Sequence, residues 1–295
     1  MPRATVQSRY STGVYGVVGR EIGYSLSPYI FEQVFKSLGW RADYARFDIE
    51  KRELRLLLDS MRTAPIRGLS VTKPYKELII SHLDRLDESA NVVGAVNTVA
   101  NIRGRLVGYN TDVSGVVAAL KPVRSRLRGA NAIIFGAGGG ARAVGFALLN
   151  HLGMASVTIA ARRQSQATRL IHGLQDRMPP AQLASAAFRP ATDLNYSLSH
   201  ADLIVNATPI GTQGKSRDLV LPAGVKMRPT AIAFDLVYRP RPTQFSMEAR
   251  RGGCRTIIDG WPMLVAQAEA AFQLWTGRKF LTSVRLSLLS HRQLP

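Results

Sequence analysis

The sequence predicts an α/β protein with two domains, each built on a mostly parallel sheet covered by helices. Apolar β-rich segments alternate with helical segments along most of the 295 residues, which is the order typical of parallel sheets. A chain of this length is sufficient for two domains of ordinary size. A glycine-rich turn, Gly136–Gly140, joins an apolar segment to a helical one, as in α/β domains that bind nucleotides.

The first part of the chain begins with alternating strands and helices. Pro28 suits the first turn of a helix, and Ser27 before it is a good N-cap. Leu54, Leu57 and Leu58 have helical spacing. The predicted elements are a strand at Val14–Gly19, a helix at Pro28–Leu38, a strand at Tyr44–Asp48, a helix at Glu50–Met61, a strand at Ile66–Thr72 and a helix that begins over Lys76–His82.

The remaining elements continue this alternation after a hairpin. Two β-rich runs within Ala95–Val107 flank Asn101–Gly104, which predicts an antiparallel pair of strands. Gly277 is placed to end the last long helix. The further predicted elements are a helix at Val113–Leu120, strands at Ala132–Phe135, Ser156–Ala160, Leu203–Asn206, Ala231–Asp235 and Thr256–Ile258, and a helix at Met263–Trp275.

The composition indicates a globular, cytoplasmic protein without a metal centre. Hydrophobic residues make up 46% of the chain, and no apolar run is long enough to cross a bilayer. The first residues lack the apolar centre of a secretory signal. Cys254 is the only cysteine, and the five histidines have no ligand spacing. Neither an internal disulfide nor a cysteine-only metal site is therefore expected.

The net charge of +19, with a pI of about 10.9, is the unusual feature of the composition. Such a surplus favours contact with polyanions. The basic residues are mostly scattered, however, and neither an aromatic-interleaved RNA-binding pattern nor zinc-finger spacing occurs. We therefore do not expect nucleic-acid binding. An acidic small-molecule ligand would also be attracted by the positive field.

The glycine-rich turn has the spacing of a dinucleotide-binding turn. Gly136 and Gly138 occupy the first two glycine positions of G-x-G-x-x-G, and Ala141 occupies the third. Glycines allow the backbone to approach a pyrophosphate, and the N-terminus of the next helix supplies free N–H groups. This arrangement predicts a Rossmann-type domain. A tight strand-to-helix turn that binds no ligand is the alternative.

The second strand-to-helix turn favours NADP over NAD. An NAD site usually has an acidic residue at the end of the second strand, where it binds the ribose 2′-hydroxyl. Here the strand is followed by Ala161, Arg162 and Arg163. Guanidinium groups match the oxygens of a 2′-phosphate. A pair of solvated arginines is the alternative interpretation.

Several short motifs follow one another along the chain from about Gly16 to Trp275. They are GYSLSP (Gly23–Pro28), GLSVTKPYK (Gly68–Lys76), GAVNT (Gly94–Thr98), GYNTD (Gly108–Asp112), the glycine-rich turn, NATPIG (Asn206–Gly211), DLVYRPRPT (Asp235–Thr243) and DGWPMLVAQ (Asp259–Gln267). In order and spacing these motifs resemble those of the shikimate dehydrogenase family. Each motif alone is weak, but their joint occurrence is specific.

The resemblance implies a reaction and a division of the chain. The reaction is the reversible, NADPH-dependent reduction of 3-dehydroshikimate to shikimate in aromatic amino-acid biosynthesis. The chain would form an N-terminal substrate domain, residues 1–113 plus 262–295, and a Rossmann-type NADP-binding domain, residues 114–261, with a cleft between them. Lys76 and Asp112 match the family's catalytic pair. Such a pair suits hydride transfer, because the alkoxide that develops needs a positioned donor to stabilise and protonate it.

The resemblance also implies residues that bind the two reactants. Lys73 would face solvent. Substrate-binding residues would be Ser25 and Ser27 at the carboxylate, with Tyr238, and Thr72, Lys76, Asn97, Asp112 and Gln267 at the hydroxyls. Cofactor-binding residues would be Glu88, Gly136, Ala137, Gly138, Gly139, Gly140, Ala161, Arg162, Arg163, Thr208, Leu236 and Gly260. A homodimer is the expected assembly.

Three departures from the family pattern bear on the choice of substrate. Tyr24 replaces a histidine, Ser70 replaces an asparagine, and Ala161 replaces the asparagine of the cofactor turn. A relative that acts on quinate or aminoshikimate is therefore an alternative. A non-catalytic nucleotide-sensing or nucleic-acid-binding protein, suggested by the net charge, is an alternative of another class.

Overall fold

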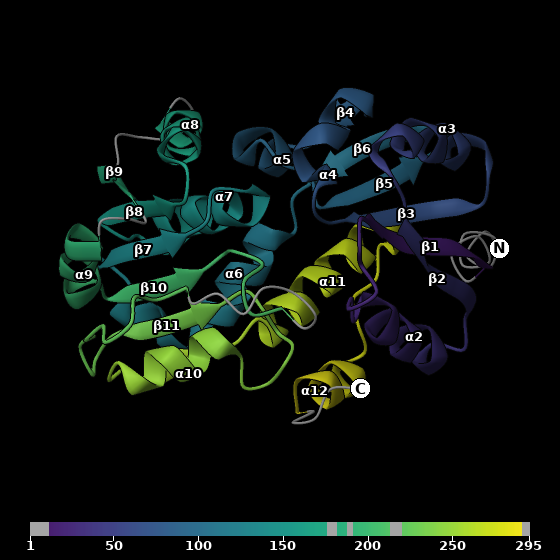
Figure 1. Ribbon diagram of the computed structural model, residues 1–295. Coiled ribbons are helices and arrows are strands. Elements are labelled where there is room, and N and C mark those ends of the chain that lie inside the picture. Colours follow the sequence, from purple (N-terminus) through teal and green to yellow (C-terminus); the bar gives the residue numbers. More distant parts are fainter. Residues whose placement is uncertain (1–11, 176–181, 188–190, 213–219, 291–295) are drawn as a thin grey trace. The chain divides into compact units, whose positions relative to one another are not determined.

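The computed structural model describes residues 12–175, 182–187, 191–212 and 220–290 (Figure 1). They divide into two compact units. The first contains the described residues up to Thr111 and from Val265 onward, and the second is Asp112–Leu264. Each unit is built on one six-stranded sheet with helices, so the α/β class is confirmed.

The sheet of the first unit is mixed. Its strand order is β2-β1-β3-β5-β6-β4; β1 pairs in parallel with β2 and β3, whereas β5 is antiparallel to β3 and β6. The elements are β1 (Thr12–Gly19), α2 (Ser27–Ser37), β2 (Arg41–Asp48), η1 (Lys51–Glu53), α3 (Leu54–Thr63), β3 (Ile66–Val71), α4 (Tyr75–Leu78), η2 (Ile79–His82), β4 (Arg85–Leu86), α5 (Glu88–Val93), β5 (Thr98–Ile102) and β6 (Arg105–Tyr109). Near the C-terminus lie α11 (Trp261–Thr276), most of which belongs to this unit, and α12 (Thr282–Ser290).

The predicted hairpin and the predicted C-terminal helix are both present in this unit. Arg103 and Gly104 have φ angles of 56° and 85°, as the central residues of a tight hairpin turn require. On α11, the Trp275 indole donates to the Val99 carbonyl at 3.0 Å. A Cβ on Gly68 of β3 would overlap the Trp275 ring. Helix α11 therefore packs directly on the sheet that carries the predicted substrate residues.

The sheet of the second unit is parallel throughout its described pairings. Its strand order is β12-β11-β10-β7-β8-β9, the order of a doubly wound dinucleotide-binding sheet. Helices α9 and α10 contribute to one core with Ile133 and Phe135 of β7. The elements are α6 (Asp112–Leu120), η3 (Lys121–Arg126), β7 (Asn131–Phe135), α7 (Gly139–Phe146), η4 (Ala147–His151), β8 (Ser156–Ala161), α8 (Gln164–Gln175), β9 (Gln182–Ala187), α9 (Ala191–His200), β10 (Leu203–Asn206), β11 (Ile232–Asp235), α10 (Gln244–Arg251) and β12 (Thr256–Ile258).

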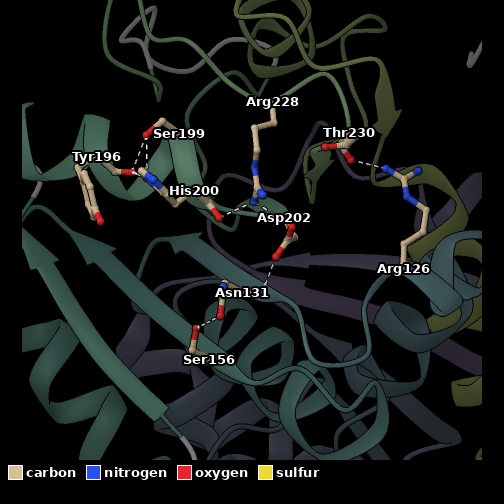
Figure 2. A network of polar contacts seen from close by, with 9 residues as sticks. All are labelled: Arg126, Asn131, Ser156, Tyr196, Ser199, His200, Asp202, Arg228 and Thr230. Carbon is tan, nitrogen blue, oxygen red and sulfur yellow. Dashed lines mark hydrogen bonds and ion pairs between the residues drawn. The ribbon is translucent and has the colours of Figure 1, made fainter.

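The amino-terminal edge of this second sheet is held by a polar network (Figure 2). Asp202, which precedes β10, accepts hydrogen bonds at 2.9 Å from the Asn131 amide and from Arg228. Arg228 also donates to the His200 carbonyl, and Arg126 donates to the Thr230 carbonyl. Because the strands are parallel, this edge is the one opposite the predicted cofactor turns. Among the described residues, no helix is both long and apolar enough to cross a membrane.

Candidate active site

The two predicted carboxylate-binding serines lie where β1 leads into α2. Both are buried, with 6% of Ser25 and 5% of Ser27 exposed. Helix α2 begins at Ser27 with Leu26 in the N-cap position, so the prediction that Ser27 is the N-cap is wrong. Instead, the Ser25 hydroxyl accepts from the Ser27 amide at 3.4 Å, and Arg46 donates to the Ser25 carbonyl at 3.1 Å. The serines are thus fixed together at the start of the helix.

The turn that carries Thr72 and Lys76 follows β3 directly. The Thr72 amide donates to the Val18 carbonyl of β1 at 2.9 Å. The Lys76 carbonyl accepts from the Val96 amide at 2.7 Å. These bonds hold the turn between the carboxyl end of β1 and the segment that contains Asn97. Ligands of α/β sheets bind at this end of the strands.

Tyr24 and Lys73 connect the segment that carries Ser25 and Ser27 with the turn that carries Thr72 and Lys76. Lys73 is half-buried, and its ammonium nitrogen lies 5.0 Å from the centroid of the Tyr24 ring. The prediction that Lys73 faces solvent is therefore wrong, because the aromatic residue at position 24 provides a cation–π partner. The Arg20 amide also donates to the Lys73 carbonyl at 3.1 Å. The two turns are thus joined through backbone and side chain.

Asn97 is the centre of a buried polar network in the first unit. Its Nδ2 donates to Thr111 Oγ1 at 2.9 Å and to Gln267 Oε1 at 3.4 Å. Its Oδ1 accepts from the Thr111 amide at 2.6 Å and from the Thr98 hydroxyl at 3.1 Å. The structure thus brings together Asn97 and Gln267, two predicted substrate residues from distant parts of the chain. Buried polar side chains held in this way are suited to recognising hydroxyl groups.

Thr111 is a site residue that the sequence reasoning missed. It lies within the GYNTD motif, immediately before Asp112, and only 3% of it is exposed. Its bonds to Asn97 fix the end of the segment from which α6 begins. Asp112, the first residue of α6, is itself buried, with 5% exposed. The Asn97 network therefore restrains the backbone immediately before the predicted catalytic carboxylate.

Two predicted site residues lie outside these clusters. Glu88, predicted to contact the cofactor, is exposed at the first position of α5 in the first unit. Tyr238, predicted to bind the substrate carboxylate, is half-buried in the second unit, three residues after the end of β11.

The glycine-rich turn lies at the carboxyl end of β7 in the second unit. Gly136 has a φ angle of 113°, and a Cβ there would lie 3.0 Å from the Ala207 carbonyl oxygen. At Gly138 an added Cβ would have nothing within 4 Å. Helix α7 begins at Gly139, two residues before the predicted start at Ala141, and Gly138 provides no side-chain cap. The glycine at position 138 therefore leaves room beside the N-terminus of α7, where a pyrophosphate can be bound.

The neighbouring strand ends supply the other predicted cofactor residues. Ala161 is the last residue of β8 and is buried, while Arg162 and Arg163 after it are exposed. Exposed guanidinium groups at this position can reach a 2′-phosphate. Thr208 follows β10, and Leu236 follows β11. These residues and the open glycine turn fit a dinucleotide phosphate.

Asn206 and Asp235 end β10 and β11, and sequence reasoning gave them no role. Both are fully buried at the carboxyl edge of the sheet, with 0% and 1% exposed. Burial raises the pKa of Asp235 to about 7, although the hydrogen bonds that it accepts lower it. The signal in the sequence was a polar residue ending an apolar strand in each of two motifs. Among the described residues, no cluster of His, Cys, Asp or Glu could hold a metal ion.

Comparisons with known proteins match this chain to models and members of one family. A family model described as the shikimate dehydrogenase substrate binding domain matches residues 17–99, and one described as the shikimate 5'-dehydrogenase C-terminal domain matches residues 260–284. The shikimate dehydrogenase (NADP(+)) of Moorella thermoacetica is 38% identical over 278 residues, which cover 93% of this chain and 91% of that protein.

Solved structures are similar over nearly the whole chain. Shikimate 5-dehydrogenase from Thermus thermophilus, in complex with NADP(H) and shikimate, has a TM-score of 0.80 and 35% identity, covering 94% of this chain and 98% of that one. Quinate dehydrogenase from Corynebacterium glutamicum, in complex with NAD, has a TM-score of 0.82 and 29% identity, covering 95% and 99%.

Proposed function

The chain belongs to the shikimate dehydrogenase family, and we propose that it catalyses the reversible, NADPH-dependent reduction of 3-dehydroshikimate to shikimate. This reaction is a step in aromatic amino-acid biosynthesis. The observation that carries the proposal is the buried network of Asn97, Thr111 and Gln267. It lies in the unit that also carries Lys76, and it leads directly into Asp112.

In the proposed reaction Lys76 and Asp112 act on the oxygen of the substrate carbonyl. NADPH, when bound, supplies the hydride that reduces the carbonyl carbon. The Lys76 ammonium stabilises the negative charge that develops on the oxygen and gives it a proton. Asp112 takes part in the transfer of that proton. In the reverse direction the same pair removes a proton from the hydroxyl of shikimate.

The proposed substrate contacts are polar groups of the first unit, together with Tyr238 of the second. Ser25 and Ser27 bind the carboxylate of shikimate, with Tyr238. Thr72, Asn97 and Gln267 bind its hydroxyls. Because a buried polar group left without a partner costs about 1–3 kcal/mol, such a site discriminates against ligands that lack the matching hydroxyl.

The proposed cofactor contacts lie at the carboxyl edge of the second sheet. The glycine turn and the first amides of α7 bind the pyrophosphate. Arg162 and Arg163 bind the 2′-phosphate, which selects NADP. Thr208, Leu236 and Gly260 contact the remainder of the dinucleotide, and Ala161 lies beside the adenosine end. Glu88 is a further proposed contact.

A quinate/shikimate dehydrogenase is the second candidate. It is favoured by the similarity to a quinate dehydrogenase and by Tyr24 beside the two serines, where the family has histidine. This tyrosine lies 5.0 Å, ring centroid to ammonium nitrogen, from Lys73. Steady-state kinetics on both alcohols distinguishes the two candidates.

The test is an absorbance assay of NADPH formation with purified protein, using shikimate and quinate side by side with NADP and NAD. We expect turnover of shikimate with NADP. Turnover of neither alcohol with either nucleotide would refute the proposal. A salt-dependent gel shift with nucleic acid at physiological ionic strength would instead support the non-catalytic alternative.

We also propose the substrate domain as residues 1–113 plus 262–295 and the NADP domain as 114–261, close to the two compact units. The cytoplasm is the proposed location, supported by a single cysteine and by the use of NADPH. A homodimer is the proposed assembly, supported by exposed leucines on α12, of which Leu286 is 61% exposed. Light scattering after size-exclusion chromatography tests the assembly.

A further inference from the structure

We propose that Asn206 and Asp235 act as one positioning pair that holds Thr208 and Leu236 in the conformation that binds NADP. The inference rests on the proposed function, because it concerns the same cofactor. It assigns a role to two residues at the carboxyl edge of the second sheet that contact each other rather than the reacting atoms.

The pair is joined by a direct hydrogen bond between neighbouring strands. Asn206 Nδ2 donates to Asp235 Oδ1 at 2.9 Å, and the Val237 amide donates to the same oxygen at 2.9 Å. The Leu236 amide donates to the Asn206 carbonyl at 2.9 Å. The backbone on both sides of Leu236 is therefore tied to the pair.

The other end of Asn206 fixes the turn after β10. Its Oδ1 accepts from the Thr208 amide at 3.0 Å and from the Thr208 hydroxyl at 2.7 Å. Its Nδ2 also donates to the Ile210 carbonyl at 3.3 Å. These contacts use both ends of the amide, so rotation of the Asn206 side chain would break all of them. Thr208 is thus held by Asn206, which in turn is held by Asp235.

The same two turns form part of the wall around the glycine turn. The carbonyl of Ala207, between Asn206 and Thr208, would lie 3.0 Å from a Cβ on Gly136. Leu236 Cδ2 would lie 3.3 Å from a Cβ on Gly140. A shift of either turn would therefore alter the space in which the pyrophosphate binds.

Stability alone does not explain why an aspartate is buried at position 235. Its Oδ2 is buried and makes no hydrogen bond of good geometry among the described residues, although the Thr243 side chain lies near enough to lower the pKa of this carboxyl. A buried carboxylate that is only half satisfied destabilises a fold. A positioning role accounts for the residue, because Oδ1 organises two donors from separate segments.

The experiment measures NADP affinity by calorimetry for Asp235→Ala, Asn206→Ala and the double variant, with Asp202→Ala as the matched control. Asp202 is the acceptor of two comparable hydrogen bonds, but on the opposite edge of the same sheet (Figure 2). We expect Asp235→Ala and Asn206→Ala each to raise Kd for NADP at least about tenfold, with little change in KM for shikimate. The double variant should be no worse than the weaker-binding single variant, because coupled residues are not additive. Asp235→Asn keeps the Oδ1 acceptor and should restore affinity to within about threefold of wild type.

Several results would overturn the inference. They are wild-type affinity in both the Asp235→Ala and Asn206→Ala variants, additive losses in the double variant, or a loss in Asp202→Ala as large as in Asp235→Ala at equal melting temperature. If Asp235→Ala does not fold, the contrast of Asn206→Ala with Asp202→Ala decides the question. A wild-type protein that binds no NADP refutes the proposed function itself, whereas normal wild-type binding with unaffected variants refutes only the positioning role.

Discussion

Replacing Asn97 with alanine removes the side chain that joins three segments of the substrate site. The Thr111 amide, now bonded to Asn97 Oδ1 at 2.6 Å, would be left without that buried acceptor, which costs about 1–3 kcal/mol. A lost hydrogen bond to a substrate hydroxyl adds about 1 kcal/mol. Because the bond to Thr111 restrains the start of α6, its loss also lets Asp112 shift from its reacting position, and we expect the total loss of transition-state stabilisation to be about 2–3 kcal/mol. That corresponds to a fall in kcat/KM of roughly 30- to 150-fold.

The assay is steady-state oxidation of shikimate well below the melting temperature, with Asn101→Ala as control. Asn101 lies four residues further along, near the other end of β5, where its side chain bonds the Met61 and Ile66 carbonyls and accepts from the Gly104 amide. Both variants should melt about 4–8 °C lower, for about 2 kcal/mol each, but only Asn97→Ala should lose activity. Equal loss of kcat/KM in the two variants, or none in Asn97→Ala, would contradict the role of the network.

Four further outcomes follow from the same geometry. Lys76→Ala should lower kcat by about 10²–10⁴-fold while calorimetric NADP binding survives; unchanged turnover would remove its assigned role. Arg162→Ala should raise KM for NADP far more than for NAD, and equal effects would exclude contact with the 2′-phosphate. At Gly138 an alanine methyl group would meet no protein atom within 4 Å, so Gly138→Ala should keep the melting temperature and reduce NADP affinity only by filling the space for the pyrophosphate. At Gly260 the methyl group would overlap the Leu236 carbonyl, so Gly260→Ala should lower the melting temperature. Because burial raises the pKa of Asp235 to about 7, the folded state binds a proton more tightly than the unfolded state does, so the free energy of unfolding should fall as pH rises from about 4 to about 7. Urea unfolding should show a smaller fall in Asp235→Asn, and the same pH dependence in both proteins would contradict the raised pKa.

The sequence predicted the central strands and two edge strands, β2 and β12, but it missed the other two edge strands, β4 and β9. β7, β10 and β11 are short apolar runs because parallel strands are covered on both faces. In contrast, β4 consists of Arg85–Leu86 alone, and β9 (Gln182–Ala187) has no β-branched residue. Both lie at the edge of a sheet, where pairing depends on the neighbouring strand rather than on local composition.

For the site, the motifs gave the residue types but not their partners. Asn97 and Gln267, which are separated by 170 residues, meet through a hydrogen bond of 3.4 Å, a contact that depends on how α11 packs on the sheet. The contact of Lys73 with Tyr24 likewise depends on the approach of two turns. No local sequence pattern encodes either contact, so a single sequence read by itself reveals neither of them.

Some arginines of the second unit donate hydrogen bonds to backbone carbonyls, and these arginines contribute to the net charge of the protein. Arg126 bonds the Thr230 carbonyl, and Arg124 bonds the His151 carbonyl at 3.1 Å. A neutral carbonyl oxygen accepts a hydrogen bond from a guanidinium group without neutralising its charge, so each such arginine still contributes one positive charge to the field around the protein. Part of the high net charge therefore comes from arginines that have a structural role. Within a screening length of about 10 Å at moderate salt, this positive field attracts anionic metabolites to the protein. Added salt should therefore lower their association rate without breaking the arginine–carbonyl hydrogen bonds.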